Sequence, residues 1–231
     1  MAYDALLFDL DDTLLDFRAC EYSAFKLAFC SIVSLPSEKD FDDMWATYQE
    51  VSAVFWAKRE ELGGRRSIQL AIDASLERCG IPIGFGTALS DAYWREFCCM
   101  SCAYPGVLDA IKVLATNFRL GVVTNGLADA QRGRLRASGL ESYFKAIAIS
   151  DEVGYAKPDE RIFHAALDQL CVTPDRALFV GDSIEYDYAG ALRAGVDFCL
   201  VRNDGGGRSD VQCKHVVTQL PELLPLLLQV S

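Results

Sequence analysis

Near its beginning the chain reads Ala5-Leu6-Leu7-Phe8-Asp9-Leu10-Asp11-Asp12-Thr13-Leu14. An apolar run leads to the carboxylates of Asp9 and Asp11 and to the hydroxyl of Thr13, at intervals of two residues. Residues at this interval in a strand point to the same side. A short apolar run that ends in acidic residues is typical of a buried parallel strand, and open α/β sheets bind ligands at that end of their strands. The stretch therefore predicts a strand that opens into a site.

The two carboxylates need a physical reason to lie side by side. Two carboxylates about 4 Å apart repel each other by roughly 4 kcal/mol at an effective dielectric near 20. A cation, a proton or a function must offset that repulsion on a buried strand. The alternative is a surface turn in which Asp11-Asp12-Thr13 caps a helix, but Asp9 follows the apolar run too closely for ordinary turn chemistry.

Composition limits the classes of protein that remain. The 231 residues, 51% of them hydrophobic, suit one large soluble domain or two modest ones. A net charge of −11 argues against a nucleic-acid polymer as partner, because such binders need basic patches. We expect no secretory signal and no membrane span, since no apolar run approaches about 18 residues. With nine cysteines read as reduced thiols, the sequence predicts a cytoplasmic protein.

Residues 17–103 have a helical character of their own. Apolar residues recur there at helical spacing, without a strand pattern. Breaks near Leu35-Pro36, Gly63-Gly64 and Gly80-Ile81-Pro82 divide the region into four helices, which predict a small bundle. Tyr104-Pro105-Gly106 closes the region with a turn.

From residue 107 onward, helices and strands alternate. We predict strands at 119–124, 146–150, 177–181 and 197–201, and helices at 107–116, 129–138, 158–171, 185–194 and 220–228. Such alternation gives a parallel sheet with helices on both faces. We therefore expect an α/β fold, with a Rossmann-like core of residues 1–16 and 104–231 and a helical cap domain, residues 17–103, inserted after the first strand.

Polar residues follow the ends of three later strands. Thr124 and Asn125 precede a helix whose N-terminal amides can hold an anion, Lys157 offers a cation, and Asp182 and Asp187 offer carboxylates. Taken singly, each has an ordinary explanation as a helix cap or a solvated turn. Because parallel strands end at one edge of a sheet, the combination predicts a single site.

The spacing resembles the four motifs of the haloacid dehalogenase-like hydrolase superfamily. They are Asp9-x-Asp11-x-Thr13, Thr124, Lys157 and Gly181-Asp182-x-x-x-x-Asp187. The resemblance covers essentially the whole chain, and the inserted helices look like the first cap class of that family. Three stretches are similar to sequences of one subgroup of that family, which contains pyrimidine 5′-nucleotidases and N-acylneuraminate-9-phosphatases. These stretches are Asp9–Leu14, Val123–Gly126 and Gly181–Gly190.

The resemblance implies a phosphatase, a hydrolase of phosphomonoesters. Asp9 would attack phosphorus to form an aspartyl-phosphate. Asp11 would protonate the leaving oxygen and then activate the water that clears the intermediate. Thr124, the backbone amides around Asn125, and Lys157 would hold the phosphoryl oxygens.

The resemblance also implies Mg²⁺ as cofactor. It would bind the Asp9 carboxylate, the Asp11 backbone carbonyl and Asp182, with Asp187 orienting a ligand or a metal-bound water. An oxygen-only set suits Mg²⁺ better than zinc. The charge balance agrees, because four carboxylates and a dianionic phosphate face one lysine.

The expected partner is a small phosphorylated metabolite, with nucleoside 5′-monophosphates first and small sugar phosphates next. Arg65 and Arg66 in the helical region are a candidate basic loop for the leaving group, and the alternative for them is a solvated turn. Arg18, just past the first motif, is a further candidate. The oligomeric state and the physiological substrate stay open.

Other functions share parts of this pattern. Dehalogenases lack an acid two residues after the nucleophile, so Asp11 argues against dehalogenation. A sugar phosphomutase of the same superfamily stays open, because it shares the motifs and a helical cap. From other classes, a phospho-accepting signalling domain would carry its acceptor Asp after a middle strand in a domain of about half this length, and a non-catalytic binding protein would not need intact motifs.

Overall fold

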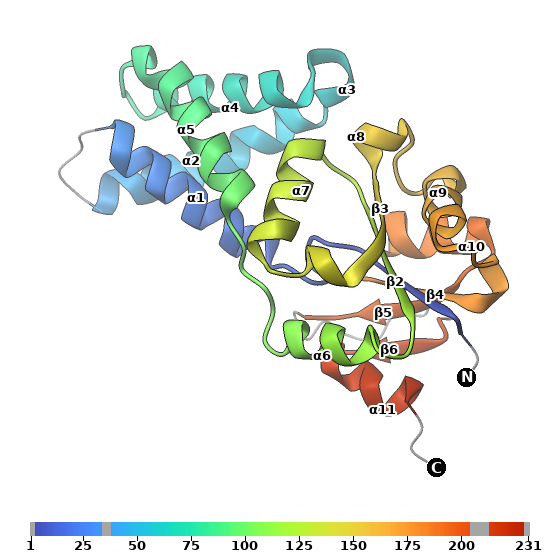
Figure 1. Ribbon diagram of the computed structural model, residues 1–231. Helices are drawn as coiled ribbons and strands as arrows, with labels where there is room; N and C mark the ends of the chain where they lie inside the picture. Colours follow the sequence, from blue (N-terminus) through green and yellow to red (C-terminus); the bar gives the residue numbers. More distant parts are fainter. Residues whose placement is uncertain (1–2, 34–37, 204–212, 229–231) are drawn as a thin grey trace. The chain divides into compact units, whose positions relative to one another are not determined.

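The structure, a computed structural model, describes residues 3–33, 38–203 and 213–228 (Figure 1). The chain divides into two compact units. One unit joins Met1–Phe17 to Ser101–Ser231, and the other is Arg18–Met100. That the second unit acts as a cap stays a prediction.

The first unit is built on a parallel sheet in the order β3-β2-β1-β4-β5-β6. Its strands are β1 (Ala5–Phe8), β2 (Arg119–Thr124), β3 (Phe144–Ile149), β4 (Ala177–Gly181), β5 (Asp197–Val201) and β6 (His215–Val217). The apolar run before Asp9 forms an interior strand, since Leu6 pairs with Leu120 of β2 on one side and with Leu178 of β4 on the other. The edge strand β6 was not predicted, because it is short and carries no extended apolar run.

Helices cover both faces of this sheet. They include α6 (Val107–Leu114), α7 (Ala128–Ala137), α8 (Ser150–Val153), α9 (Glu160–Leu170), α10 (Ala189–Ala194) and α11 (Leu223–Leu227). Side chains alternate along β1, so Leu6 and Phe8 join a core cluster with α6 and α11, whereas Ala5 and Leu7 join a second cluster with α9 and α10. The predicted α/β architecture is confirmed.

Two helices differ from the predictions, one in the residue at which it begins and one in its type. The helix predicted from residue 158 begins at Glu160, because the Asp159 side chain accepts a hydrogen bond from the Arg161 amide and acts as its N-cap. The helix predicted at 185–194 is a π-helical segment, η4 (Ile184–Tyr188), followed by α10. Short 3₁₀ turns lie at η2 (Glu141–Tyr143), η3 (Pro174–Arg176) and η5 (Leu220–Glu222).

The second unit is helical in its described residues. It contains α1 (Phe17–Ile32, from its second residue), α2 (Glu38–Trp56), α3 (Arg59–Leu62), α4 (Gly64–Arg78), the 3₁₀ turn η1 (Ile83–Phe85) and α5 (Gly86–Cys99). Aromatic side chains fill its core: the ring centroids of Phe25 and Tyr48 lie 4.5 Å apart, and those of Phe25 and Tyr93 lie 5.6 Å apart. The break predicted at Leu35-Pro36 lies outside the described residues. None of the described helices is both long and apolar enough to cross a bilayer.

Candidate active site

The site begins where β1 ends. The Asp9 amide donates to the Val180 carbonyl oxygen at 2.9 Å, which extends the pairing of β1 with β4 by one residue. The chain then turns at Asp12, whose φ is +58°, and the Asn203 side-chain amide donates to the Asp12 carbonyl oxygen at 2.8 Å. The strand and this turn together fix the backbone on either side of Asp11.

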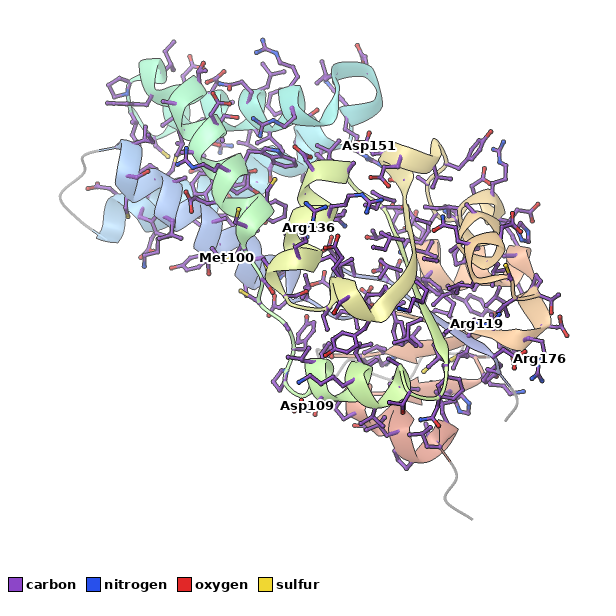
Figure 2. The ribbon with its side chains drawn as sticks, in the orientation of Figure 1. Met100, Asp109, Arg119, Arg136, Asp151 and Arg176 are labelled. Carbon is purple, nitrogen blue, oxygen red and sulfur yellow. The ribbon has the colours of Figure 1, made fainter. Side chains whose placement is uncertain are left out.

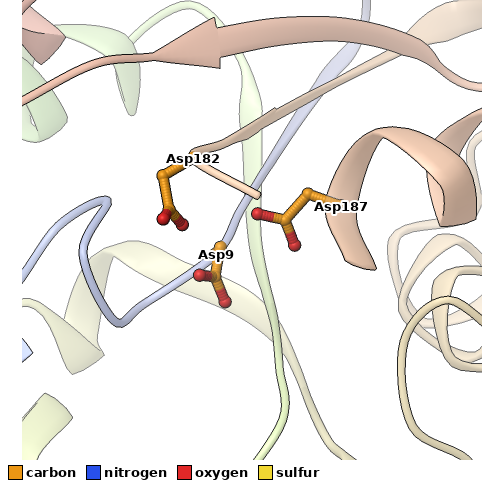
Figure 3. A group of neighbouring side chains, drawn as sticks. All are labelled: Asp9, Asp182 and Asp187. Carbon is orange, nitrogen blue, oxygen red and sulfur yellow. The ribbon is translucent and has the colours of Figure 1, made fainter. Parts of the chain in front are cut away.

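Three carboxylates meet at the ends of β1 and β4 and in η4. Asp9, Asp182 and Asp187 each offer an oxygen within 4.8 Å of the others (Figure 3). Asp187 is fully buried and its Oδ2 accepts a hydrogen bond from the Ser183 amide at 3.1 Å. A Cβ on Gly181 would lie 2.3 Å from the Asp187 Oδ2, so glycine at this position allows the close approach.

A buried lysine lies between two of these carboxylates. Lys157 Nζ is 2.5 Å from Asp9 Oδ1 and 2.7 Å from Asp187 Oδ1. Asn125 holds the backbone of this lysine on both sides: its Oδ1 accepts from the Lys157 amide at 2.8 Å, and its Nδ2 donates to the Lys157 carbonyl oxygen at 3.0 Å. The loops after β2 and β3 are thus tied together where the lysine enters the site.

Burial and crowding of like charges perturb these groups. Burial raises the pKa of Asp9 well above its ordinary value; Asp187 and Asp182 add to the rise, and Lys157 opposes it. The pKa of Asp182 rises to about 7, again through burial first and then through Asp187 and Asp12. Burial alone would lower the pKa of Lys157, but Asp187 and Asp9 outweigh burial and raise it. Three carboxylates face one lysine, so the cluster would have a net negative charge with all of its groups ionised.

The Asp11 carboxylate does not belong to this acidic cluster. Its Oδ1 lies 2.5 Å from Arg134 Nη1, and its Oδ2 accepts from Gln131 Nε2 at 2.9 Å. Gln131 Nε2 also lies 2.8 Å from the hydroxyl of Thr124, which is buried at the end of β2. Asp11 is thereby connected to Thr124 through one side chain.

Gln131 and Arg134 were not predicted from the sequence, because both lie on the helix α7 and not at the end of a strand. Their spacing was the available signal. Residues three apart on a helix share a face, and this helix directly follows the strand that ends in Thr124.

Arg65 and Arg66, predicted to meet the leaving group, and Arg18, the further candidate, belong to the second unit. Arg65 Nη2 lies 3.1 Å from Asp91 Oδ1, and its guanidinium carbon lies 4.7 Å from the centroid of the Trp94 ring. Arg18 and Arg66 are exposed. Their roles toward a substrate stay predictions.

The acidic cluster fits a hard divalent cation. Three carboxylates offer only oxygen ligands, the type that Mg²⁺ prefers. Burial, and then the neighbouring carboxylates, raise the pKa of Asp9 and of Asp182, so a bound cation would favour their charged forms. The sequence predicts the Asp11 backbone carbonyl, and not its side chain, as a metal ligand. The contacts of the Asp11 side chain with Arg134 and Gln131 are compatible with that prediction.

Comparisons with known proteins agree with one another. The family model described as haloacid dehalogenase-like hydrolase matches residues 3–195. Pyrimidine 5′-nucleotidase YjjG of Escherichia coli is 32% identical over 86% of each chain. A glyceraldehyde 3-phosphate phosphatase of Methanopyrus kandleri is also 32% identical, over 86% of this chain and 83% of its own.

A solved structure extends the similarity to three dimensions. The putative HAD-hydrolase YfnB of Bacillus subtilis, solved bound to magnesium, superposes with a TM-score of 0.82. It is 31% identical in sequence, and the match covers 98% of this chain and 99% of that one. Both the core and the helical unit of the present chain therefore have counterparts in that structure.

Proposed function

Because the chain belongs to the haloacid dehalogenase-like hydrolases, we propose that it is a Mg²⁺-dependent phosphomonoesterase acting through a phosphorylated Asp9. The grouping of Asp9 with Asp182, Asp187 and Lys157 carries this proposal. Such a group joins a nucleophile, oxygen ligands for a metal and a cation for phosphoryl oxygens. The structure of YfnB was solved with magnesium bound, which supports the choice of cation.

In the first half-reaction, an Asp9 oxygen attacks phosphorus and the bond from phosphorus to the ester oxygen breaks. Asp11 gives a proton to that oxygen as it leaves. Lys157 and Thr124 hold the phosphoryl oxygens, and backbone amides near Asn125 assist them. When bound, Mg²⁺ would be held by the Asp9 and Asp182 carboxylates and the Asp11 backbone carbonyl, and would supply positive charge that offsets the charge of the phosphoryl group.

In the second half-reaction, water attacks the same phosphorus and Asp11 accepts a proton from it. The bond from phosphorus to Asp9 breaks, which restores the Asp9 carboxylate and releases inorganic phosphate. The exclusion of water around Asp9, which is 6% exposed, strengthens the electrostatic interactions used in both steps.

Nucleoside 5′-monophosphates are the first candidate substrates and small sugar phosphates the next. YjjG, a pyrimidine 5′-nucleotidase, and the phosphatase of M. kandleri, named for glyceraldehyde 3-phosphate, support these two classes. In both classes the proposed chemistry is the same, and the leaving group differs.

The test is release of inorganic phosphate from a panel of pyrimidine and purine nucleoside monophosphates, glyceraldehyde 3-phosphate, hexose phosphates and p-nitrophenyl phosphate. Activity should vanish with EDTA and return with added Mg²⁺. A protein that releases no phosphate from any of them with Mg²⁺ present contradicts the proposal.

A further inference from the structure

Arg134 heads the fully buried side chains of the described residues when these are ranked by size. It lies on α7, at the core of the first unit. Burying an isolated charge is costly, so a buried arginine implies a charged partner. That partner is Asp11, whose Oδ1 lies 2.5 Å from Arg134 Nη1 and whose side chain is 24% exposed.

Two further contacts of Arg134 help to fix its direction. Nη1 also donates to Gln131 Oε1 at 3.2 Å, and the guanidinium carbon lies 5.7 Å from the centroid of the Phe17 ring. Gln131, one turn earlier on α7, is itself buried and donates to the other oxygen of Asp11. One oxygen of the Asp11 carboxylate thus accepts a hydrogen bond from Gln131, and the other forms an ion pair with Arg134 of the same helix.

This arrangement favours a role beyond charge balance. An unanchored Asp11 at the turn after β1 would sample several side-chain rotamers. The hydrogen bond to Oδ2 and the ion pair at Oδ1 together favour one orientation, and Gln131 connects that orientation to Thr124. A misplacement of about 1 Å can reduce the rate of an enzyme roughly a hundredfold.

We propose that Arg134, acting with Gln131, is a positioning residue that holds the Asp11 carboxylate in place for proton transfer. The inference rests on the proposed function, in which Asp11 accepts a proton from the water that attacks phosphorylated Asp9. That step breaks the bond from phosphorus to Asp9 and yields inorganic phosphate. Asp11 and Asp9 act on substrate; Arg134 acts only through Asp11.

The experiment separates the two half-reactions with p-nitrophenyl phosphate and Mg²⁺. Its leaving group departs as a stable anion, so formation of phosphorylated Asp9 needs no proton from Asp11. Arg134→Met is mixed with substrate in a stopped-flow instrument. We expect one equivalent of p-nitrophenolate at nearly the parent rate, followed by a steady state about tenfold to a hundredfold slower than the parent.

Two further variants make the result specific. Arg136→Met is the matched control: Arg136 lies on the same helix (Figure 2), its side chain is 63% exposed, and it pairs with Glu141 at 3.1 Å. It should behave as the parent in both phases. Arg134→Lys, which keeps the charge but loses the planar fork, should fall between the parent and Arg134→Met.

A merely structural role would lower the first turnover and the steady state by the same factor. That result, or unchanged kinetics in both phases, overturns the proposal. Near-ultraviolet circular dichroism shows whether Arg134→Met folds. If it does not, the first-turnover and steady-state rates are compared in Arg134→Lys and in Gln131→Leu instead. A parent protein without Mg²⁺-dependent phosphate release contradicts the proposed function instead, and so the two failures are distinct.

Discussion

Asp9 and Lys157 illustrate, at the scale of single residues, how burial and charge oppose each other. Removing either partner of a buried ion pair leaves an uncompensated charge, which commonly costs about 3–5 kcal/mol. Lys157 contacts both Asp9 and Asp187, so its loss leaves two carboxylates facing each other. The ion pair of Lys157 with Asp9 therefore connects the loops after β1 and β3, and both of its residues are also candidate catalytic groups.

Asp9→Asn should abolish turnover, with a loss of at least about a thousandfold, because the amide cannot form the phosphorylated intermediate. The variant should keep its circular dichroism spectrum. Asp109→Asn, which replaces an exposed carboxylate on α6 (Figure 2), is the matched control and should retain full activity. Substantial turnover by Asp9→Asn would remove Asp9 as the nucleophile.

Asp182 should make the stability of the metal-free protein depend on pH. Its pKa is raised from 3.8 to about 7 in the folded state, so folding favours the protonated form. The stabilisation is complete below the unfolded pKa and is lost as pH rises through about 7. We expect the free energy of unfolding to fall by roughly 2 kcal/mol more in the parent than in Asp182→Asn between about pH 5 and 8.

Urea unfolding in EDTA at several pH values measures this difference. Added Mg²⁺ at about pH 8 should restore stability to the parent and much less to Asp182→Asn. Equal pH dependence in the two proteins would show that Asp182 does not titrate as its surroundings indicate.

At the scale of elements, β4 and η4 share a close contact that positions Asp187. Gly181 ends β4, and the Asp187 side chain occupies the space that a Cβ would need. The Asp187 side chain cannot swing away freely, because it is fully buried and bonded to the Ser183 amide. The geometry of the acidic cluster thus depends on a residue that carries no functional group.

Gly181→Ala should therefore destabilise the protein by about 1–3 kcal/mol and weaken Mg²⁺ binding. Thermal unfolding and titration calorimetry with Mg²⁺ measure the two effects. Gly84→Ala is the control, since a Cβ there meets nothing within 4 Å. A Gly181→Ala protein that binds Mg²⁺ as tightly as the parent would show that Asp187 can adjust without cost.

Elements with strong periodicity were predictable, and those decided by tertiary contacts were not. The run before Asp9 indicated β1 because four consecutive apolar residues suit a strand buried on both faces. β6 escaped prediction because three residues at a sheet edge carry little pattern. Among site residues, Asp182 directly follows β4 and could be anticipated. Lys157 was predicted at the end of a strand, and the structure places α8 between it and β3. Arg134 becomes informative only when its burial against Asp11 is known.

At the scale of the whole molecule, we propose that the sheet unit carries out the chemistry and predict that the helical unit selects the substrate. The proposed catalytic groups all belong to the sheet unit, and Arg65 and Arg66 belong to the helical unit. Arg65 already pairs with Asp91 and stacks near Trp94. The prediction that these arginines bind the leaving group therefore requires a kinetic test.

Replacing Arg65 and Arg66 together by alanine should raise KM for the physiological substrate about tenfold and leave KM for p-nitrophenyl phosphate nearly unchanged. The reason is that the prediction requires contact between these arginines and the leaving group of the physiological substrate, which p-nitrophenyl phosphate lacks. Arg78→Ala removes an exposed arginine of the same unit, paired with Glu50, and serves as control. Equal increases of KM for both substrates would refute the basic-loop assignment.

The most direct measurement is rapid acid quenching of the protein during turnover with Mg²⁺, followed by peptide mass spectrometry. The account predicts one phosphoryl group per chain, carried on Asp9 and absent after EDTA treatment. A protein that turns over phosphomonoesters with no phosphorylated residue, or with the phosphoryl group on a residue other than Asp9, would contradict it.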